Sequence, residues 1–226
     1  MLTFSSQPLT VGAITDEKAL SENFDTSSAD LLELRLDSLG ASHSVLNFAK
    51  RHHSTIPLLI TARDPAEGGL NALPFAERLG LLRSLIPFAS AVDVELNNVD
   101  QYSPFLDEVR KGGIKIVLSN HNFKSFDHVA TIEALTQSRT LGADVAKAAV
   151  TLKDPVDLTL FESLLASRGE APFSLMGMGP YGPTSRLLAA QHGSLLNYGY
   201  LGAEPTAPGQ WPAPLLKQVL THCPSF

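Results

Sequence analysis

The chain has 226 residues, of which 44% are hydrophobic, and it carries a formal net charge of -6 with a pI near 5.6. The acidic balance and scattered arginines argue against a nucleic-acid partner, and no apolar run approaches the ~20 residues that span a membrane, so we expect a cytoplasmic protein with a small-molecule substrate. The single cysteine, Cys223, excludes an intrachain disulfide, and no cluster of ligands indicates a metal or redox cofactor.

Short β-branched or apolar runs alternate with segments of helical periodicity along the chain. In chain order we expect strands at 9–15 and 31–36, a helix at 45–52, a strand at 57–62, a helix at 74–86, a strand at 91–96, a helix at 104–111, a strand at 114–119, a helix at 127–141, a strand at 144–150, a helix at 156–167, strands at 173–177 and 195–199, and a closing helix at 214–222. Repeated strand–helix units favour a parallel sheet, and eight strands in this length favour an α/β fold closed into a (β/α)8 TIM barrel like that of the class I aldolases. Because no linker, repeat or low-complexity tract interrupts the pattern, we expect one catalytic domain over residues 1–226.

Two of the expected strands alternate charged and apolar residues, in Glu33-Leu34-Arg35-Leu36-Asp37 and in Val92-Asp93-Val94-Glu95-Leu96. Successive side chains of a strand point to opposite faces, so the charges share one face and the aliphatic residues share the other. In a barrel covered by helices, the aliphatic face packs against the helices. The charged face is therefore expected to point into the barrel lumen.

Lys147 lies in the apolar run Val145-Ala146-Lys147-Ala148-Ala149, which is typical of a buried strand. Burial disfavours the charged form of an amine, and a neutral amine is a nucleophile for a carbonyl carbon. Lysine is far more often exposed or salt-bridged, and luminal charges also form purely structural ion networks. A covalent imine enzyme is the functional hypothesis that the position of Lys147 favours.

Other polar residues follow the same parity as Lys147 near the carboxyl ends of the strands. These inward-facing residues are Thr61, Arg63, Ser119 and His121. Active sites of this architecture lie at that end of the barrel, so we expect these side chains to meet there.

At these positions the chain resembles the type I 3-dehydroquinate dehydratase family. The resemblance spans nearly the whole length and rests on seven motifs that occur in the order of the family, each at a strand end or in the loop after it. The motifs are Glu33-Leu34-Arg35-Leu36-Asp37; Thr61-Ala62-Arg63 with Glu67-Gly68-Gly69; Ser119-Asn120-His121-Asn122-Phe123; Ala143-Asp144-Val145-Ala146-Lys147; Met176-Gly177 with Ser185-Arg186-Leu187; Gly193-Ser194; and Ala207-Pro208-Gly209-Gln210.

The resemblance implies a lyase that eliminates water from 3-dehydroquinate to give 3-dehydroshikimate in the shikimate pathway. Lys147 would condense with the C3 ketone, and the protonated imine would acidify the hydrogen at C2. His121 would remove that proton and later protonate the departing C1 hydroxyl, because an imidazole titrates near neutral pH. Glu67 would hydrogen-bond His121 and fix its tautomer, with Gly68 and Gly69 allowing a tight turn beside it.

The resemblance also implies the residues that bind the substrate. Arg186 would pair with the substrate carboxylate, for which a planar guanidinium offers two parallel hydrogen bonds. Thr206 and Gln210 would close over that carboxylate from a lid formed by residues 204–210. Glu33, Arg35 and Arg63 would hold the hydroxyls and the ketone.

Three positions differ from the commonest pattern of the family. Thr206 replaces a serine, Asn122 follows His121 where aspartate is frequent, and Gly12 stands where some members have a serine. We expect these differences to alter rate, affinity or the pKa of His121, and to leave the chemistry unchanged.

Two other functions are weighed against the lyase. A class I aldolase shares the barrel and the imine lysine, but it needs a phosphate site after the seventh and eighth strands, where this chain has Ser185, Arg186 and residues 206–210. A binding protein or inactive homologue is disfavoured because His121 and Lys147 are both present. Relatives are often homodimers, but the sequence leaves the oligomeric state open, together with a biosynthetic or a catabolic role and the order of the lid without ligand.

Overall fold

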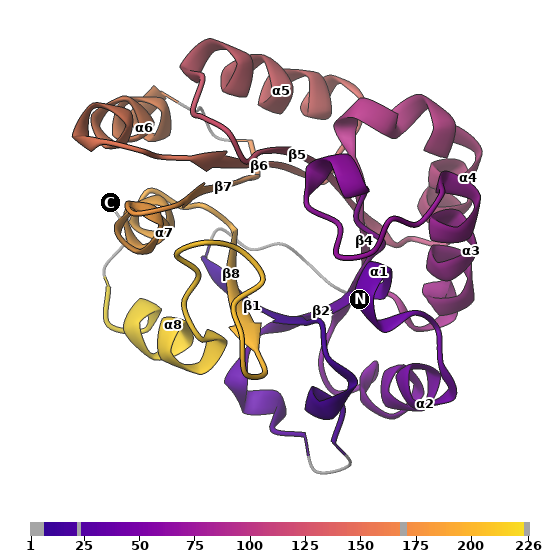
Figure 1. Cartoon of the computed structure of the whole chain (residues 1–226). Helices are drawn as coiled ribbons and strands as arrows, with labels where there is room; N and C mark the ends of the chain where they lie inside the picture. The colour runs from indigo at the N-terminus through magenta and orange to yellow at the C-terminus, as the bar shows by residue number, and fades with distance from the viewer. Residues whose placement is uncertain (1–6, 22–23, 168–170, 224–226) are drawn as a thin grey trace.

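The computed structural model describes residues 7–21, 24–167 and 171–223, and its centre is a barrel of eight parallel strands (Figure 1). The strands are β1 Leu9–Ile14, β2 Leu31–Arg35, β3 Leu58–Thr61, β4 Ala91–Glu95, β5 Lys115–Asn122, β6 Val145–Thr151, β7 Phe173–Met178 and β8 Leu196–Leu201. Strands β1 to β7 are adjacent in chain order, and β8 pairs with β1. The expected (β/α)8 fold and all eight expected strands are confirmed, with boundaries that differ by at most three residues.

The seam between β7 and β8 closes with few backbone bonds. The amide of Leu195 donates to Phe173 O over 2.8 Å, and the hydroxyl of Ser174 donates to Leu196 O over 2.5 Å. Ser194 supplies a further link, since its hydroxyl accepts from the amide of Leu175 over 3.1 Å. Side-chain hydroxyls therefore complete the barrel where the strand ladder is incomplete.

The helices form a ring outside the strands (Figure 1). They are α1 Leu36–Leu39, α2 His43–His52, α3 Phe75–Leu85, α4 Val99–Lys111, α5 His128–Thr140, α6 Pro155–Ser167, α7 Gly182–Gln191 and α8 Ala213–Leu220, with short 3-10 turns between some elements. No helix among the described residues has the length and apolar character needed to cross a membrane.

The short helix α1 was not expected, and two longer helices also differ from the expectation. The helix expected at 104–111 begins at Val99 instead, with Pro104 inside it, because burial of Tyr102, Phe105 and Leu106 on one face offsets the missing amide donor of proline. Helix α7 was not expected, because its first residues Gly182 and Pro183 are typical of a turn. Proline is tolerated there because the first helical amides have no partner within the helix.

The core is divided by the barrel wall into an outer and an inner part. Leu34 of β2 and Val94 of β4 pack in the outer part with Phe48 of α2 and Tyr102 of α4. A smaller cluster inside the barrel includes Val11, Leu31, Val117, Val145 and Leu196. The expected orientation of the two strand faces is confirmed, so the charges of β2 and β4 are held inside the ring.

Candidate active site

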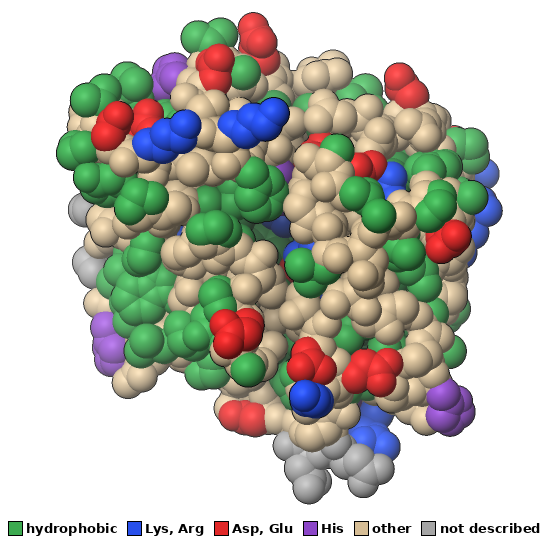
Figure 2. All heavy atoms as spheres, in the orientation of Figure 1, with side chains coloured by type: hydrophobic (Ala, Val, Ile, Leu, Met, Phe, Trp, Pro, Cys, Tyr) green, Lys and Arg blue, Asp and Glu red, His purple; other side chains and the backbone are tan. Residues whose placement is uncertain are grey.

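A pocket opens at the carboxyl ends of the strands and is lined by all nine residues selected from the sequence. These are Glu33, Arg35, Arg63, Glu67, His121, Lys147, Arg186, Thr206 and Gln210. Figure 2 shows this region as a hollow near the middle of the visible face, with side-chain atoms of basic residues inside it. Residues that were not selected complete the lining, among them Phe123, Met176, Met178 and Tyr198.

Lys147 projects into this pocket from β6 and is 4% exposed. Its Nζ lies 2.8 Å from Oδ2 of Asp93 and 3.9 Å from the centre of the Tyr198 ring. Burial lowers the pKa of Lys147 below its usual value, and the attraction of Asp93 only partly opposes that shift. The amine therefore loses its proton more readily than a surface lysine, as a nucleophile requires.

Asp93 of β4 joins Lys147 to a second cation. Its Oδ2 lies 3.0 Å from Nη2 of Arg63, and its Oδ1 accepts from the Ser119 hydroxyl over 2.6 Å. Burial opposes ionisation of this carboxyl, but Arg63 and Lys147 together hold the pKa of Asp93 well below its usual range. Asp93 therefore places a negative charge beside the amine.

Arg63 follows β3 and binds three protein groups at once. Besides Asp93, its Nη1 lies 2.9 Å from Oε1 of Glu95 and donates to the Ser119 hydroxyl over 2.7 Å. Glu95 in turn contacts Arg78 of α3 at 3.3 Å. The network neutralises the charges that the barrel wall buries and fixes the strand ends that carry the site.

His121 is oriented by Glu67, as expected from the sequence. Oε2 of Glu67 accepts from the backbone amide of His121 over 2.9 Å and lies 3.0 Å from Nδ1 of the ring. Asn97 donates to Oε1 of the same carboxyl over 2.8 Å. With Nδ1 engaged by Glu67, the other ring nitrogen is the one available to a ligand.

Burial shifts the protonation of both partners of this contact. It raises the pKa of Glu67 to about 7, and the nearby Arg63 opposes that rise. It lowers the pKa of His121 well below its usual range, and the positive charges of Arg63 and Lys147 act in the same direction. The imidazole is therefore neutral near pH 7, which is the form that accepts a proton.

The turn that positions Glu67 requires the two glycines after it. Gly68 has φ +87°, and a β carbon there would lie 2.5 Å from the Phe123 ring. A β carbon on Gly69 would lie 2.5 Å from the carbonyl oxygen of Arg63. Only glycine fits both positions without displacing residues of the site.

Arg186 of α7 is a buried cation without a carboxylate partner among the described residues. It is 3% exposed, its Nη1 donates to Tyr198 O over 2.9 Å, and its Nε has no hydrogen-bond partner in the part of the chain that the structure describes. Burial lowers the pKa of Arg186 to about 10. A guanidinium with unused donors on a pocket wall is suited to an anion, and its shape suits a carboxylate.

The expected lid lies next to Arg186. The backbone amide and the hydroxyl of Thr206 both donate to Oε1 of Gln210, each over 2.7 Å. The loop is attached to α7 and the strand before it, because Trp211 donates to Pro183 O over 3.1 Å and Gly179 donates to Pro208 O over 3.2 Å. Thr206 and Gln210 are thereby held at the mouth of the pocket.

Glu33 and Arg35 reach the opposite wall from β2. Oε1 of Glu33 accepts from the Thr61 hydroxyl over 2.8 Å. Arg35 makes two parallel bonds of 2.9 Å to Asp37 and a longer one to Gly68 O. These contacts hold one negative and one positive group at fixed positions on this side of the pocket.

The three unusual positions have different locations. Thr206 lines the pocket, whereas Oδ1 of Asn122 accepts from the backbone amides of Lys124 and Ser125 and so fixes the turn after β5. The missing side chain of Gly12 would meet Leu201 outside the lumen. Of the three, Thr206 alone is placed to contact a ligand directly.

The two residues that contact the amine of Lys147, Asp93 and Tyr198, were not selected from the sequence. Asp93 was recognised as a luminal charge, but its contact with Lys147 joins strands that are two apart in the sheet, and such a contact has no local signal. Tyr198 shares its strand face with the luminal Leu196, and strand parity would have placed it inside the barrel.

Comparison with known proteins identifies similar chains. A model of the type I 3-dehydroquinase family matches residues 7–223. The chain is 34% identical over 208 residues to the 3-dehydroquinate dehydratase of Albidiferax ferrireducens, covering 84% of this chain and 77% of that protein. It is 32% identical over 207 residues to the 3-dehydroquinate dehydratase of Methanocella arvoryzae, covering 90% and 91%.

Solved structures with the same name have the same fold. The 3-dehydroquinate dehydratase of Geobacillus kaustophilus superposes with a TM-score of 0.82 at 25% identity, covering 96% of this chain and 91% of that one. The type I enzyme of Clostridium difficile, solved with covalently modified comenic acid, also has a TM-score of 0.82 at 25% identity, with coverage of 97% and 93%.

Proposed function

The chain belongs to the type I 3-dehydroquinase family and is a hydro-lyase of the shikimate pathway that acts through an imine, and we propose that Lys147, His121 and Glu67 carry out its reaction. Water is eliminated from 3-dehydroquinate to give 3-dehydroshikimate. Residues 1–226 would form one catalytic domain.

The proposed role of Lys147 is to form the imine with the C3 ketone of the substrate. Its lowered pKa makes the neutral amine accessible, and the side chain lines the pocket while only 4% exposed. The protonated imine keeps a positive charge at nitrogen, which Asp93 already faces at 2.8 Å. The ion pair of the free protein thus serves as the ion pair of the intermediate, without reorganisation.

The proposed role of His121 is to remove the C2 proton and to return a proton to the C1 hydroxyl as it leaves. His121 and Lys147 project from adjacent strands, with His121 opposite Ala149 in the register. A strand spacing of about 4.8 Å and a rise of about 3.3 Å per residue separate their α carbons by about 8 Å, which suits two groups that act on neighbouring carbons of one ring. Glu67 acts through His121 by holding the ring at Nδ1.

The proposed binding residues surround the rest of the substrate. Arg186 would pair with the carboxylate, and Thr206 and Gln210 would cover it from the lid. Glu33 and Arg35 would bind hydroxyl groups on the other wall. Arg63 would contribute mainly through its positive charge, because its guanidinium is engaged with Asp93, Glu95 and Ser119.

The observation that carries this assignment of roles is the convergence of a buried amine, a neutral imidazole and an unpaired guanidinium on one pocket. Incubation of the purified protein with 3-dehydroquinate should produce the ultraviolet absorbance of a conjugated enone. The same assay with Lys147→Ala should give almost none. Full activity of that variant would remove Lys147 from the mechanism, and a silent wild-type protein would favour a binding role.

We also propose a cytoplasmic location and a homodimer. Membership of a family of biosynthetic enzymes supports the first, and the resemblance to relatives that are often dimers supports the second. Fractionation of the producing cells and light scattering of the purified protein test these two points, and a monomeric mass would reject the dimer.

A further inference from the structure

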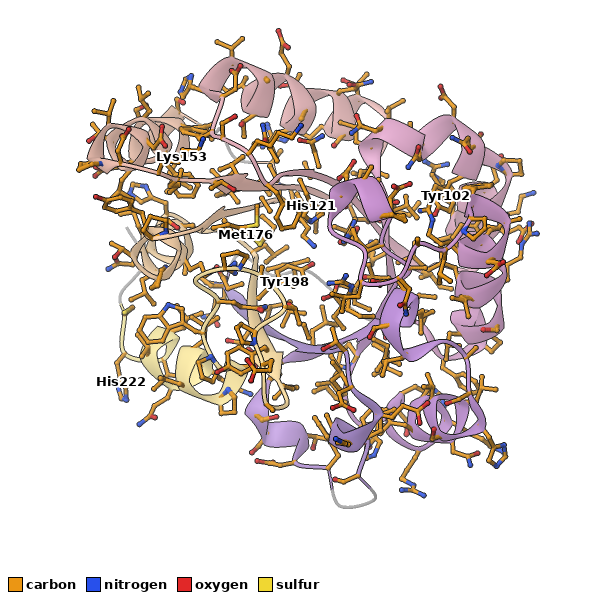
Figure 3. All side chains as sticks on the ribbon, in the orientation of Figure 1. Tyr102, His121, Lys153, Met176, Tyr198 and His222 are labelled. Carbon is orange, nitrogen blue, oxygen red and sulfur yellow. The ribbon has the colours of Figure 1, made fainter. Side chains whose placement is uncertain are left out.

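Tyr198 is the least explained residue of the pocket. It lies on β8, is 4% exposed, and packs inside the barrel with Met176. Figure 3 shows Tyr198 near the middle of the barrel, close to the positions of His121 and Met176. Its ring faces Lys147 Nζ at 3.9 Å, so it touches the amine that the mechanism uses.

The hydroxyl of Tyr198 is buried and has no hydrogen-bond partner among the described residues. Tyr102 offers a contrast, because its buried hydroxyl accepts from Arg78 over 3.1 Å on the outer side of the barrel wall. Burial and the negative charges of Asp93 and Glu33 raise the pKa of Tyr198 well above its usual range, so the hydroxyl keeps its proton. An unused buried donor is destabilising unless a ligand satisfies it.

The protein carboxylates that act on this hydroxyl are already engaged by other donors. Asp93 accepts from Ser119 and Lys147 and pairs with Arg63. Glu33 accepts from Thr61. The substrate is therefore the remaining source of a hydrogen-bond acceptor for the Tyr198 hydroxyl.

We propose that Tyr198 is a further catalytic residue, whose hydroxyl donates a hydrogen bond to the substrate oxygen that is expelled when Lys147 forms the imine. This inference rests on the proposed function. The neutral amine attacks the carbonyl carbon, the π electrons of the carbonyl move to oxygen, and one proton passes from nitrogen to that oxygen to give a carbinolamine. The carbon–oxygen bond then breaks, the oxygen leaves as water with the electron pair and a proton from solvent, and the nitrogen lone pair forms the protonated imine.

The distances are compatible with this contact. The expelled oxygen is bonded to the carbon that Nζ attacks, so it lies about 2.4 Å from Nζ, and a hydrogen bond extends about 2.8 Å farther. The path from Nζ through the expelled oxygen to a hydrogen-bond donor is therefore similar in length to the distance between Nζ and the Tyr198 hydroxyl, given that Nζ lies 3.9 Å from the centre of that ring. The donor would act on an oxygen that carries developing negative charge, which is where a fixed dipole accelerates a reaction.

The test measures exchange of the ketone oxygen without the dehydration step. Reversible imine formation between Lys147 and 3-dehydroshikimate in ¹⁸O-labelled water replaces the ketone oxygen, and mass spectrometry follows the label. Lys147→Ala gives the uncatalysed background. Tyr198→Phe should slow the catalysed exchange by about 10- to 100-fold, as expected for loss of a hydrogen bond to a charged oxygen.

The matched control is Tyr200→Phe, which removes the same hydroxyl from the same strand at a residue outside the pocket lining and should exchange at the wild-type rate. A second readout is thermal stability without ligand. Tyr198→Phe removes an unpartnered buried hydroxyl, so its Tm should be at or above that of the wild type, by up to about 2–4 °C.

The outcomes separate this inference from the function on which it rests. Wild-type exchange in Tyr198→Phe, or slow exchange with a lowered Tm, would overturn the role of the hydroxyl while leaving the imine mechanism intact. Slow exchange with an unchanged or raised Tm supports it. Absence of catalysed exchange in the wild-type protein would overturn the imine at Lys147 itself.

Discussion

Replacement of Arg186 tests how the pocket selects an anionic substrate. Arg186→Lys keeps the positive charge but loses one of the two hydrogen bonds proposed to the substrate carboxylate. A hydrogen bond to a charged group contributes about 1.5–3 kcal/mol. The dissociation constant should therefore rise by about 10- to 150-fold. Arg186→Met removes both bonds and the charge, and loss of one partner of a buried pair costs about 3–5 kcal/mol, which lowers affinity by roughly 10²- to 5 × 10³-fold.

The same residue should have the opposite effect on the stability of the free protein. Burial lowers the pKa of Arg186 from 12.5 to about 10, which corresponds to about 3 kcal/mol by which folding disfavours its charged form. Since this cost applies fully below the folded pKa, it is present at pH 7. Arg186→Met should raise stability by about 2 kcal/mol once the lost bond to Tyr198 O is counted, or a Tm increase of about 4–8 °C.

The assay combines calorimetric titration with thermal unfolding. Titration of 3-dehydroquinate into Lys147→Ala and its Arg186 double variants measures binding without turnover, and the Tm is measured on the single variants without ligand. Arg83→Lys is the control, because Arg83 pairs with Glu108 at the exposed surface. An unchanged affinity in Arg186→Lys would place the substrate carboxylate elsewhere, and a lower Tm in Arg186→Met would show that Arg186 stabilises the empty fold.

Two further variants test the electrostatics of the pocket. Asp93→Asn removes a charge that raises the pKa of Lys147, so the pH midpoint of borohydride-trapped adduct formation should move to lower pH. The control is Glu95→Gln, which also loses a bond to Arg63 but does not contact Lys147. Equal midpoints in both variants would contradict the role of Asp93. The folded pKa of Glu67 is raised from 4.5 to about 7, so its carboxyl destabilises the fold progressively as pH rises through that interval. The free energy of unfolding in urea should therefore be higher for Glu67→Gln than for the wild type, by nothing below pH 4.5 and by about 3 kcal/mol above pH 7. The variant should also have a lower kcat. A stability difference that does not change with pH would refute the raised pKa of Glu67.

The sequence was sufficient for the barrel because eight strand patterns alternate with six segments of helical periodicity. The alternation in β2 and β4 placed Glu33, Arg35 and Asp93 inside the lumen, and the structure has them there. Helix α7 was missed because Gly182 and Pro183 carry turn signals, although those residues suit the first turn of a helix equally well.

The alternation of side chains along one strand predicts which residues point into the lumen, but it does not predict which of them contact one another across it. Lys147 and His121 were found from the parity of β6 and β5. The contacts of Lys147 with Asp93 and Tyr198 depend on how the barrel closes and on the lengths of the side chains. The pattern within a single strand specifies neither. The unpaired state of Arg186 is likewise a property of its surroundings, not of its motif.

The proposed mechanism requires a covalent bond between Lys147 and the substrate. Borohydride reduction of the protein in the presence of 3-dehydroquinate, followed by proteolysis and mass spectrometry, locates that bond directly. We predict that the modified residue is Lys147. Modification of Lys115, which pairs with Asp144, or of Lys153, which lies away from the middle of the barrel in Figure 3, would contradict the account, as would recovery of an unmodified chain from an active preparation.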